Sequence, residues 1–162
     1  MEAFTDWLGA TGASMTIQNV TWIIPSVQSV HILAIAVLLA AVVTIDLRLA
    51  GVTRRGPSLA ALEMRFLPWF WIALAVLLAT GLILVVGEPA RELLNWLFYT
   101  KLVLVLAVTA LTALFQLRVR ADDGAWETTA ARRAAGRILG GASLLLVAAT
   151  ITAGRWIAYV VV

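Results

Sequence analysis

The chain has 162 residues, of which 62% are hydrophobic and 13% are charged, and its mean hydropathy is +0.98. A water-soluble domain of this size would carry more apolar side chains than its core can bury, so the composition excludes that class of protein. The absence of cysteine excludes disulfide bonds and thiolate metal sites. The pI of about 10.2 would suit nucleic-acid binding, but the placement of the cations gives another explanation.

Four apolar stretches are each long enough to cross a bilayer as a helix. A hydrocarbon core about 30 Å thick needs roughly 20 apolar residues. We therefore predict a single all-α transmembrane domain over residues 1–162, an integral membrane four-helix bundle. Short loops join neighbouring helices, which predicts antiparallel, up-down-up-down packing. The predicted spans cover residues 22–45, 66–86, 95–117 and 138–159.

The ends of these spans carry residues typical of membrane interfaces and helix starts. Pro25 and Pro68 are expected in first helical turns, where the missing N–H has no cost. Aromatic rings prefer the depth of the lipid headgroups, and they mark the span ends here. They are Trp22, Trp69, Trp71, Trp96, Trp156 and Tyr159.

The first twenty residues are predicted to lie on the membrane surface. Phe4, Trp7 and Leu8 recur at helical spacing beside Glu2 and Asp6, which predicts a short interfacial helix. The segment lacks the basic start of a signal peptide, and the apolar run that follows has the length of a full span. We therefore expect it to be retained.

The cations predict the orientation of the bundle. Nine of the twelve Lys and Arg residues fall in the loops after the first and third spans, and none precedes the first span. By the positive-inside rule, both basic loops face the cytoplasm and both termini lie outside, in the periplasm of a bacterial inner membrane. The basic pI therefore reflects topology, and no nucleic-acid partner is expected.

Each span carries a polar group at a similar depth in its outer half. His31, the only histidine, lies about 13 Å into the first span at 1.5 Å per residue, with Gln28 one turn before it on the same face. Thr80 and Lys101 lie roughly 9–10 Å deep in the second and third spans. Arg155 is near the outer end of the fourth span. Ionisable groups inside a membrane are costly, so this coincidence marks a candidate site.

Two interpretations of this cluster stay open at the level of sequence. In the first, Lys101 and Arg155 extend their charges to the outer headgroups, and His31 is a neutral hydrogen-bond partner of Thr80 or Gln28. In the second, the five residues bind a ligand. Two cations without a carboxylate at their depth then favour an anionic or acceptor-rich molecule.

Haem b and a quinone both match the cofactor-binding set. His31 is the candidate metal ligand for haem iron, with Lys101 and Arg155 on the propionates. A quinone would instead bond His31 and Lys101 through its carbonyl oxygens. The haem b interpretation is the weaker because electron-transfer centres of this type use two axial ligands and the chain has one histidine. Met64 cannot be the second ligand, since it lies on the cytoplasmic side. Copper fits less well, because His31 and Met15 would supply only two ligands.

Two further features are interpreted as structural. Asp46, at the cytoplasmic end of the first span, is expected to pair with a cation across the bundle, the candidates being Arg65, Arg118 and Arg137. The Gly136-x-x-x-Gly140 spacing, followed by Gly141 and Ser143, gives the fourth span a small-residue face for close packing. No paired carboxylates are expected inside the membrane, and no nucleophile motif indicates a hydrolase.

Several short segments carry a resemblance to an uncharacterised family of small bacterial four-span membrane proteins. They are residues 24–33 (IPSVQSVHIL), 46–49 (DLRL), 67–69 (LPW), 80–81 (TG) and 101–102 (KL). Members of that family often carry Glu where Gln28 stands here, which weakens any role that needs a carboxylate beside His31. The outer-half histidine near a helix start is also distantly similar to the copper-resistance D type of membrane protein.

Two classes of function follow. The chain is either a membrane redox or ligand-binding module that holds haem b or a quinone, or a non-catalytic accessory subunit of a larger membrane complex. Whether it is an enzyme is left open. Lipid is the expected surrounding, and a homo-oligomer or a larger complex would be compatible with the packing face on the fourth span.

Overall fold

The computed structural model describes residues 1–53, 56–120, 129–156 and 159, and all their regular structure is helical. Four helices are long and apolar enough to cross a membrane. They are α3 (Ile23–Leu49), α4 (Leu59–Gly87), α6 (Trp96–Arg120) and α8 (Ala130–Trp156). They pack antiparallel, which confirms the predicted bundle of a multi-pass membrane protein.

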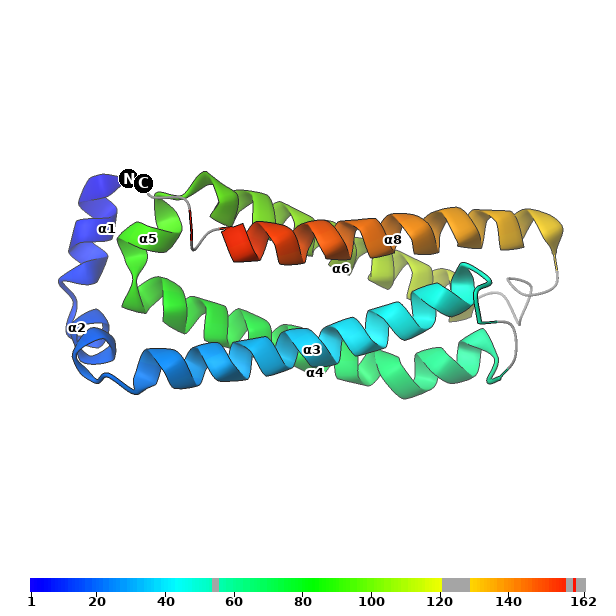
Figure 1. The fold of residues 1–162 in the computed structure, drawn as a ribbon, viewed down its shortest axis with the longest axis horizontal. Helices are drawn as coiled ribbons and strands as arrows, with labels where there is room; N and C mark the ends of the chain where they lie inside the picture. Colours follow the sequence, from blue (N-terminus) through cyan, green and yellow to red (C-terminus); the bar gives the residue numbers. More distant parts are fainter. Residues whose placement is uncertain (54–55, 121–128, 157–158, 160–162) are drawn as a thin grey trace.

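Three short helices lie at one end of the bundle, which we call the capped end (Figure 1). They are α1 (Glu2–Gly9), α2 (Gly12–Asn19) and α5 (Pro89–Leu93). At the opposite end, the loop end, residues 50–58 connect α3 to α4. The predicted N-terminal helix is present, and it is followed by a second one. Thr5 and Ser14 are buried where α1 and α2 face the bundle, whereas Phe4 and Trp7 are exposed.

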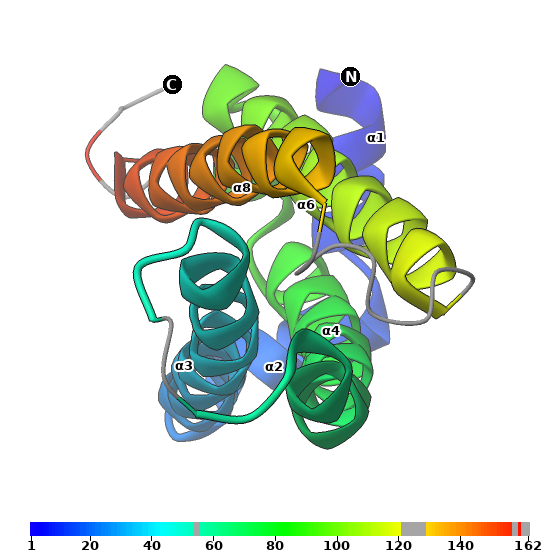
Figure 2. The same ribbon diagram turned by 90° about the vertical axis from the view of Figure 1, so that its right-hand side faces the viewer.

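The long helices form two pairs (Figure 2). α3 packs mainly on α4, and α6 packs mainly on α8. The pairs are joined chiefly where α3 meets α8, whereas α4 and α6 touch little. The seam between the pairs therefore closes on one side of the bundle more than on the other.

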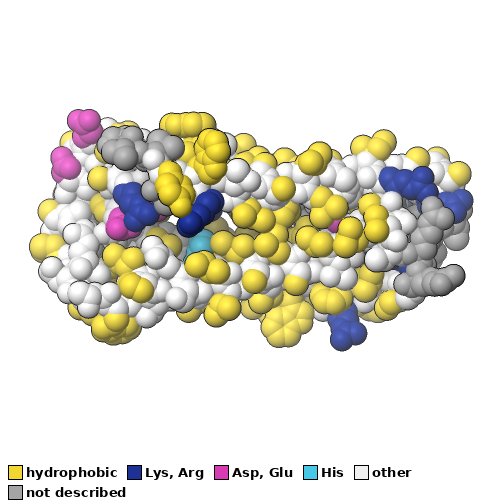
Figure 3. Space-filling view, viewed as in Figure 1, with side chains coloured by type: hydrophobic (Ala, Val, Ile, Leu, Met, Phe, Trp, Pro, Cys, Tyr) yellow, Lys and Arg dark blue, Asp and Glu magenta, His cyan; other side chains and the backbone are white. Residues whose placement is uncertain are grey.

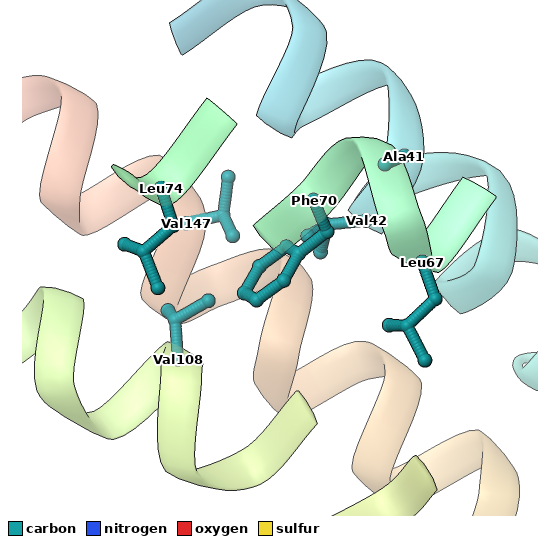
Figure 4. Packing of buried hydrophobic residues seen from close by; sticks show 7 residues of the cluster. All are labelled: Ala41, Val42, Leu67, Phe70, Leu74, Val108 and Val147. Carbon is teal, nitrogen blue, oxygen red and sulfur yellow. The ribbon is translucent and has the colours of Figure 1, made fainter. Parts of the chain in front are cut away.

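The apolar core sits at the middle of the long helices (Figure 4). Phe70 is 1% exposed and lies among side chains from all four helices, including Val42, Val108 and Val147. A second cluster of Ile45, Leu59 and Phe115 continues the core toward the loop end. Many other large apolar side chains point outward, as expected where lipid is the outer solvent.

Local sequence explains where α3 and α4 begin and end. Gly51 follows α3 with φ +76°, a left-handed conformation that glycine adopts at no steric cost, and it ends the helix. The Ser58 hydroxyl accepts a hydrogen bond from the Ala61 amide and starts α4. α4 thus begins ahead of the predicted span, and the expectation that Pro68 lies in a first turn is wrong. Pro68 lies inside the helix, where it removes one backbone N–H.

The small-residue face of α8 packs inside the chain. A Cβ added at Gly140 would lie 2.8 Å from the Asp46 carbonyl oxygen, and one added at Gly136 would lie 2.8 Å from Leu49 Cδ1. Both glycines are buried, and they allow α8 to approach the end of α3 closely. Because this contact uses the motif within one chain, the motif gives no support to dimerisation.

Candidate functional site

His31 and Thr80 join α3 to α4 in the capped half of the bundle. His31 Nδ1 lies 2.7 Å from Thr80 Oγ1. The Thr80 hydroxyl donates its single hydrogen to the Val76 carbonyl of its own helix, at 2.7 Å. While it donates to Val76, the Thr80 hydroxyl accepts from the imidazole, and the hydrogen is then on His31 Nδ1. His31 Nε2 then keeps its lone pair, so it can accept a hydrogen bond or ligate a metal.

A glycine leaves one edge of the imidazole uncovered. A Cβ at Gly81 would lie 3.8 Å from His31 Cε1, the carbon between the two ring nitrogens. Because Gly81 follows Thr80 directly, the same turn of α4 both holds the ring and leaves space beside it. Any larger side chain at this position would occupy that space.

Lys101 approaches the same region from the other pair of helices. Its side chain runs over Gly154 of α8, where an added Cβ would lie 3.6 Å from Cε and 3.8 Å from Nζ. The charge of Lys101 acts on His31 in α3 and on Glu92 in α5. Figure 3 shows the histidine, in cyan, at this face of the bundle near its capped end. His31 and Lys101 therefore lie close enough to interact electrostatically although they belong to different helix pairs.

The structure does not bring all five predicted residues together. Arg155 is exposed and belongs to a local contact, because its Nη2 donates to the Tyr159 hydroxyl at 2.9 Å and its Cζ lies 5.3 Å from that ring's centroid. Gln28 is exposed one turn before His31. The compact part of the site is His31, Thr80 and Lys101.

Glu92 belongs to the surroundings of Lys101 and was not predicted. It lies on α5, half-buried, and burial raises the pKa of its carboxyl above the ordinary 4.5, while Lys101 and Arg91 oppose that shift. Its neighbour Glu88 forms an ion pair with Arg91 at 2.7 Å. In the sequence all three residues form a short charged loop, and nothing there indicates that one carboxyl turns toward the bundle.

Asp46 has a different partner from the expected cation. Within the described part of the chain it is hydrogen-bonded by Ser143 of α8, whereas Arg65, Arg118 and Arg137 are all exposed. Glu63 of α4 lines the same cavity as Asp46, so two carboxylates face one buried space. The prediction that carboxylates are not paired there missed Glu63, because it placed the start of the second span at Phe66.

The residues described offer little for a metal held by protein alone. Among them there is no group of three or more His, Asp or Glu side chains that could hold an ion. His31 is the one imidazole of the chain, so it could serve as a single ligand to the iron of a haem. Met15 is exposed on α2.

Comparison with known proteins gives a family without an assigned activity. The sequence model of a family of unknown function, DUF6644, matches residues 3–160, which is nearly the whole chain. No curated protein and no solved structure matches significantly.

Proposed function

The chain belongs to the DUF6644 family of unknown function, and from its own geometry we propose that it is a membrane redox or ligand-binding module for a quinone-type headgroup. The ligand would lie between the two helix pairs in the capped half of the bundle. His31, Thr80 and Lys101 carry the proposal. Gln28 and Arg155 would border the site, where they are exposed at its edge.

The donor and acceptor pattern supports this ligand class. With its hydrogen on Nδ1 and directed at Thr80, His31 presents Nε2 as an acceptor for a quinol hydroxyl. Lys101 presents an ammonium, which donates to a quinone oxygen. One acceptor and one donor, on opposite sides of the seam, match a flat ring that carries oxygens at both ends. Gly81 and Gly154 leave room beside both groups.

Haem b is the second candidate, and the same lone pair on His31 favours it. Nε2 would ligate the iron and Lys101 would meet a propionate. Arg155 supports haem less than expected, because its guanidinium is bonded to Tyr159. Copper, to which the distant likeness to the copper-resistance D type would point, is supported by His31 alone.

We further propose that the capped end faces the periplasm of a bacterial inner membrane. Acidic side chains gather at the capped end of the face in Figure 3, together with some cations, and further cations lie toward the loop end. Under the positive-inside rule this distribution places the loop end in the cytoplasm. A reporter fused to the C-terminus should therefore be active only as a periplasmic reporter.

The proposal is tested by what the purified protein carries. Wild-type protein in mild detergent should retain quinone in its lipid extract, measured by mass spectrometry, or a Soret band if haem b is the ligand. His31→Leu should lose that molecule and stay folded, because leucine is well tolerated in a span. Thr44→Val is the matched control, since the Thr44 hydroxyl donates to the Ala40 carbonyl of its own helix and lies away from His31 in sequence.

Lys101→Met should weaken binding less than His31→Leu does. One charge-assisted hydrogen bond is worth roughly 1.5–3 kcal/mol, which corresponds to about 10- to 100-fold in affinity. Identical bound-molecule profiles for wild type and His31→Leu would reject the site and leave the accessory-subunit function. That function would instead be supported by co-purification of a larger membrane complex.

A further inference from the structure

A second buried polar space lies in the loop half of the bundle, away from His31. It is a cavity of about 20 Å³ between α3, α4, α6 and α8. Its lining is apolar except for four side chains that carry oxygen. These are Asp46, Glu63, Thr112 and Ser143.

Asp46 lacks a partner for one of its oxygens. Its residue is 7% exposed, and Ser143 hydrogen-bonds its carboxylate. The second oxygen, Oδ2, is buried and has no hydrogen-bond partner within the described part of the chain. A buried carboxylate oxygen without a partner is costly, so the cavity beside it is where a compensating group is expected.

The charge around this cavity is negative. Among the described residues that line it there are two carboxylates and no Lys or Arg. Glu63 takes part in a further interaction of its own. The lining residues thus supply no cation to the Asp46 carboxylate, whose Oδ2 has no hydrogen-bond partner in the described part of the chain.

We propose that this cavity binds one dehydrated monovalent cation of the size of Na⁺. Its ligands would be Asp46 Oδ2, the Glu63 carboxylate and the hydroxyls of Thr112 and Ser143. Oxygen ligands select hard cations, and the Asp46 carboxylate can balance the charge of a monovalent one. A space for about one water molecule excludes a hydrated ion, and Mg²⁺ sheds its water reluctantly.

Thermal unfolding of the full chain in detergent tests this site, with Na⁺ itself as the probe. At equal ionic strength, NaCl should raise the Tm above its value in KCl or choline chloride. A shift of roughly 5–10 °C is expected at about 100 times the Kd. Asp46→Asn should abolish the dependence on Na⁺, and Ser143→Ala should move the midpoint of the Na⁺ titration several-fold higher. Asp6→Asn, an exposed acid on α1, is the matched control and should keep the full shift.

Equal Tm values of the wild type in the three chlorides would overturn the proposal, and a water molecule or a proton would then satisfy Asp46. A Na⁺ shift that survives in Asp46→Asn would overturn it as well. If Asp46→Asn does not fold, the titrations of wild type and Ser143→Ala decide, because equal midpoints would reject Ser143 as a ligand. The experiment is independent of any ligand at His31.

Discussion

Two pairs of glycines, one in each half of the bundle, have opposite surroundings. In the loop half, Gly136 and Gly140 bring α8 against the backbone of α3, with the Asp46 carbonyl 2.8 Å from where a Cβ would stand. In the capped half, Gly81 and Gly154 meet only side-chain atoms of His31 and Lys101, at 3.6–3.8 Å. The first pair allows close helix packing, whereas a methyl group at either position of the second pair would make only ordinary van der Waals contact.

This difference matches the polar groups that each half holds. Asp46 is buried where α3 and α8 pack closely, and Ser143 hydrogen-bonds its carboxylate. The proposed cation would compensate its second oxygen. His31 and Lys101 are half-buried and belong to separate helix pairs. The close glycine contacts hold the helices together in the loop half, and under the proposed function the capped half would admit a molecule between the helix pairs.

The largest effect on stability should come from adding a side chain where α8 packs closest to α3. A Cβ at Gly140 would also lie 3.3 Å from the Ala50 amide nitrogen, and two backbone atoms cannot move aside as a side chain can. Gly140→Ala should therefore lower the free energy of unfolding by about 1–3 kcal/mol. The neighbour Gly141 has nothing within 4 Å, so Gly141→Ala should be neutral or stabilising, by up to about 1 kcal/mol. Denaturant unfolding in detergent measures both, and equal stability of the two variants would break the comparison.

A large side chain at Gly154 in the capped half should change stability less but clearly reduce ligand binding. Gly154→Leu would occupy the space next to the Lys101 side chain and displace a bound ring. Retained ligand should fall at least about tenfold, while the unfolding midpoint changes little because no backbone lies opposite. The measurement is the ligand content of the purified variant beside Gly141→Ala. Full ligand content in Gly154→Leu would show that the seam is not the binding space.

The hydroxyl of Thr80 offers a milder test of how His31 is held. Thr80→Val removes the acceptor of Nδ1–H, and a hydrogen bond between spans is worth about 0.6 kcal/mol on average. Stability should therefore drop only slightly, whereas ligand affinity should fall because the imidazole loses its orientation. Thr80→Ser keeps the hydroxyl and should restore binding. Equal affinity of the Val and Ser variants would show that Thr80 does not position the ring.

Sequence predicted the bundle well because lipid imposes strong rules on it. Apolar length gives the four spans, and the outer-half depth of His31 and Thr80 placed them close enough to bond. Depth alone could not predict rotation about each helix axis, which is why Arg155 was grouped with them although it contacts Tyr159. Glu63 was missed for a different reason, since a helix can extend past its apolar run and carry a polar residue into the core.

The smallest effect concerns Glu92 at the border of the capped half. Burial raises the pKa of its carboxyl above the ordinary 4.5, so the folded state holds this proton more tightly than the unfolded state does. Stability from this group is fully present below pH 4.5 and is lost as the pH rises through the folded pKa. Glu92→Gln should remove that loss, and a plot of unfolding free energy against pH should be flatter above pH 4.5 than for the wild type. Lys101→Met should act the other way, because the Lys101 charge favours ionised Glu92 and its removal raises the pKa further. The same slope in the wild type and in Glu92→Gln would show that the carboxyl is as well solvated in the folded chain as in the unfolded one.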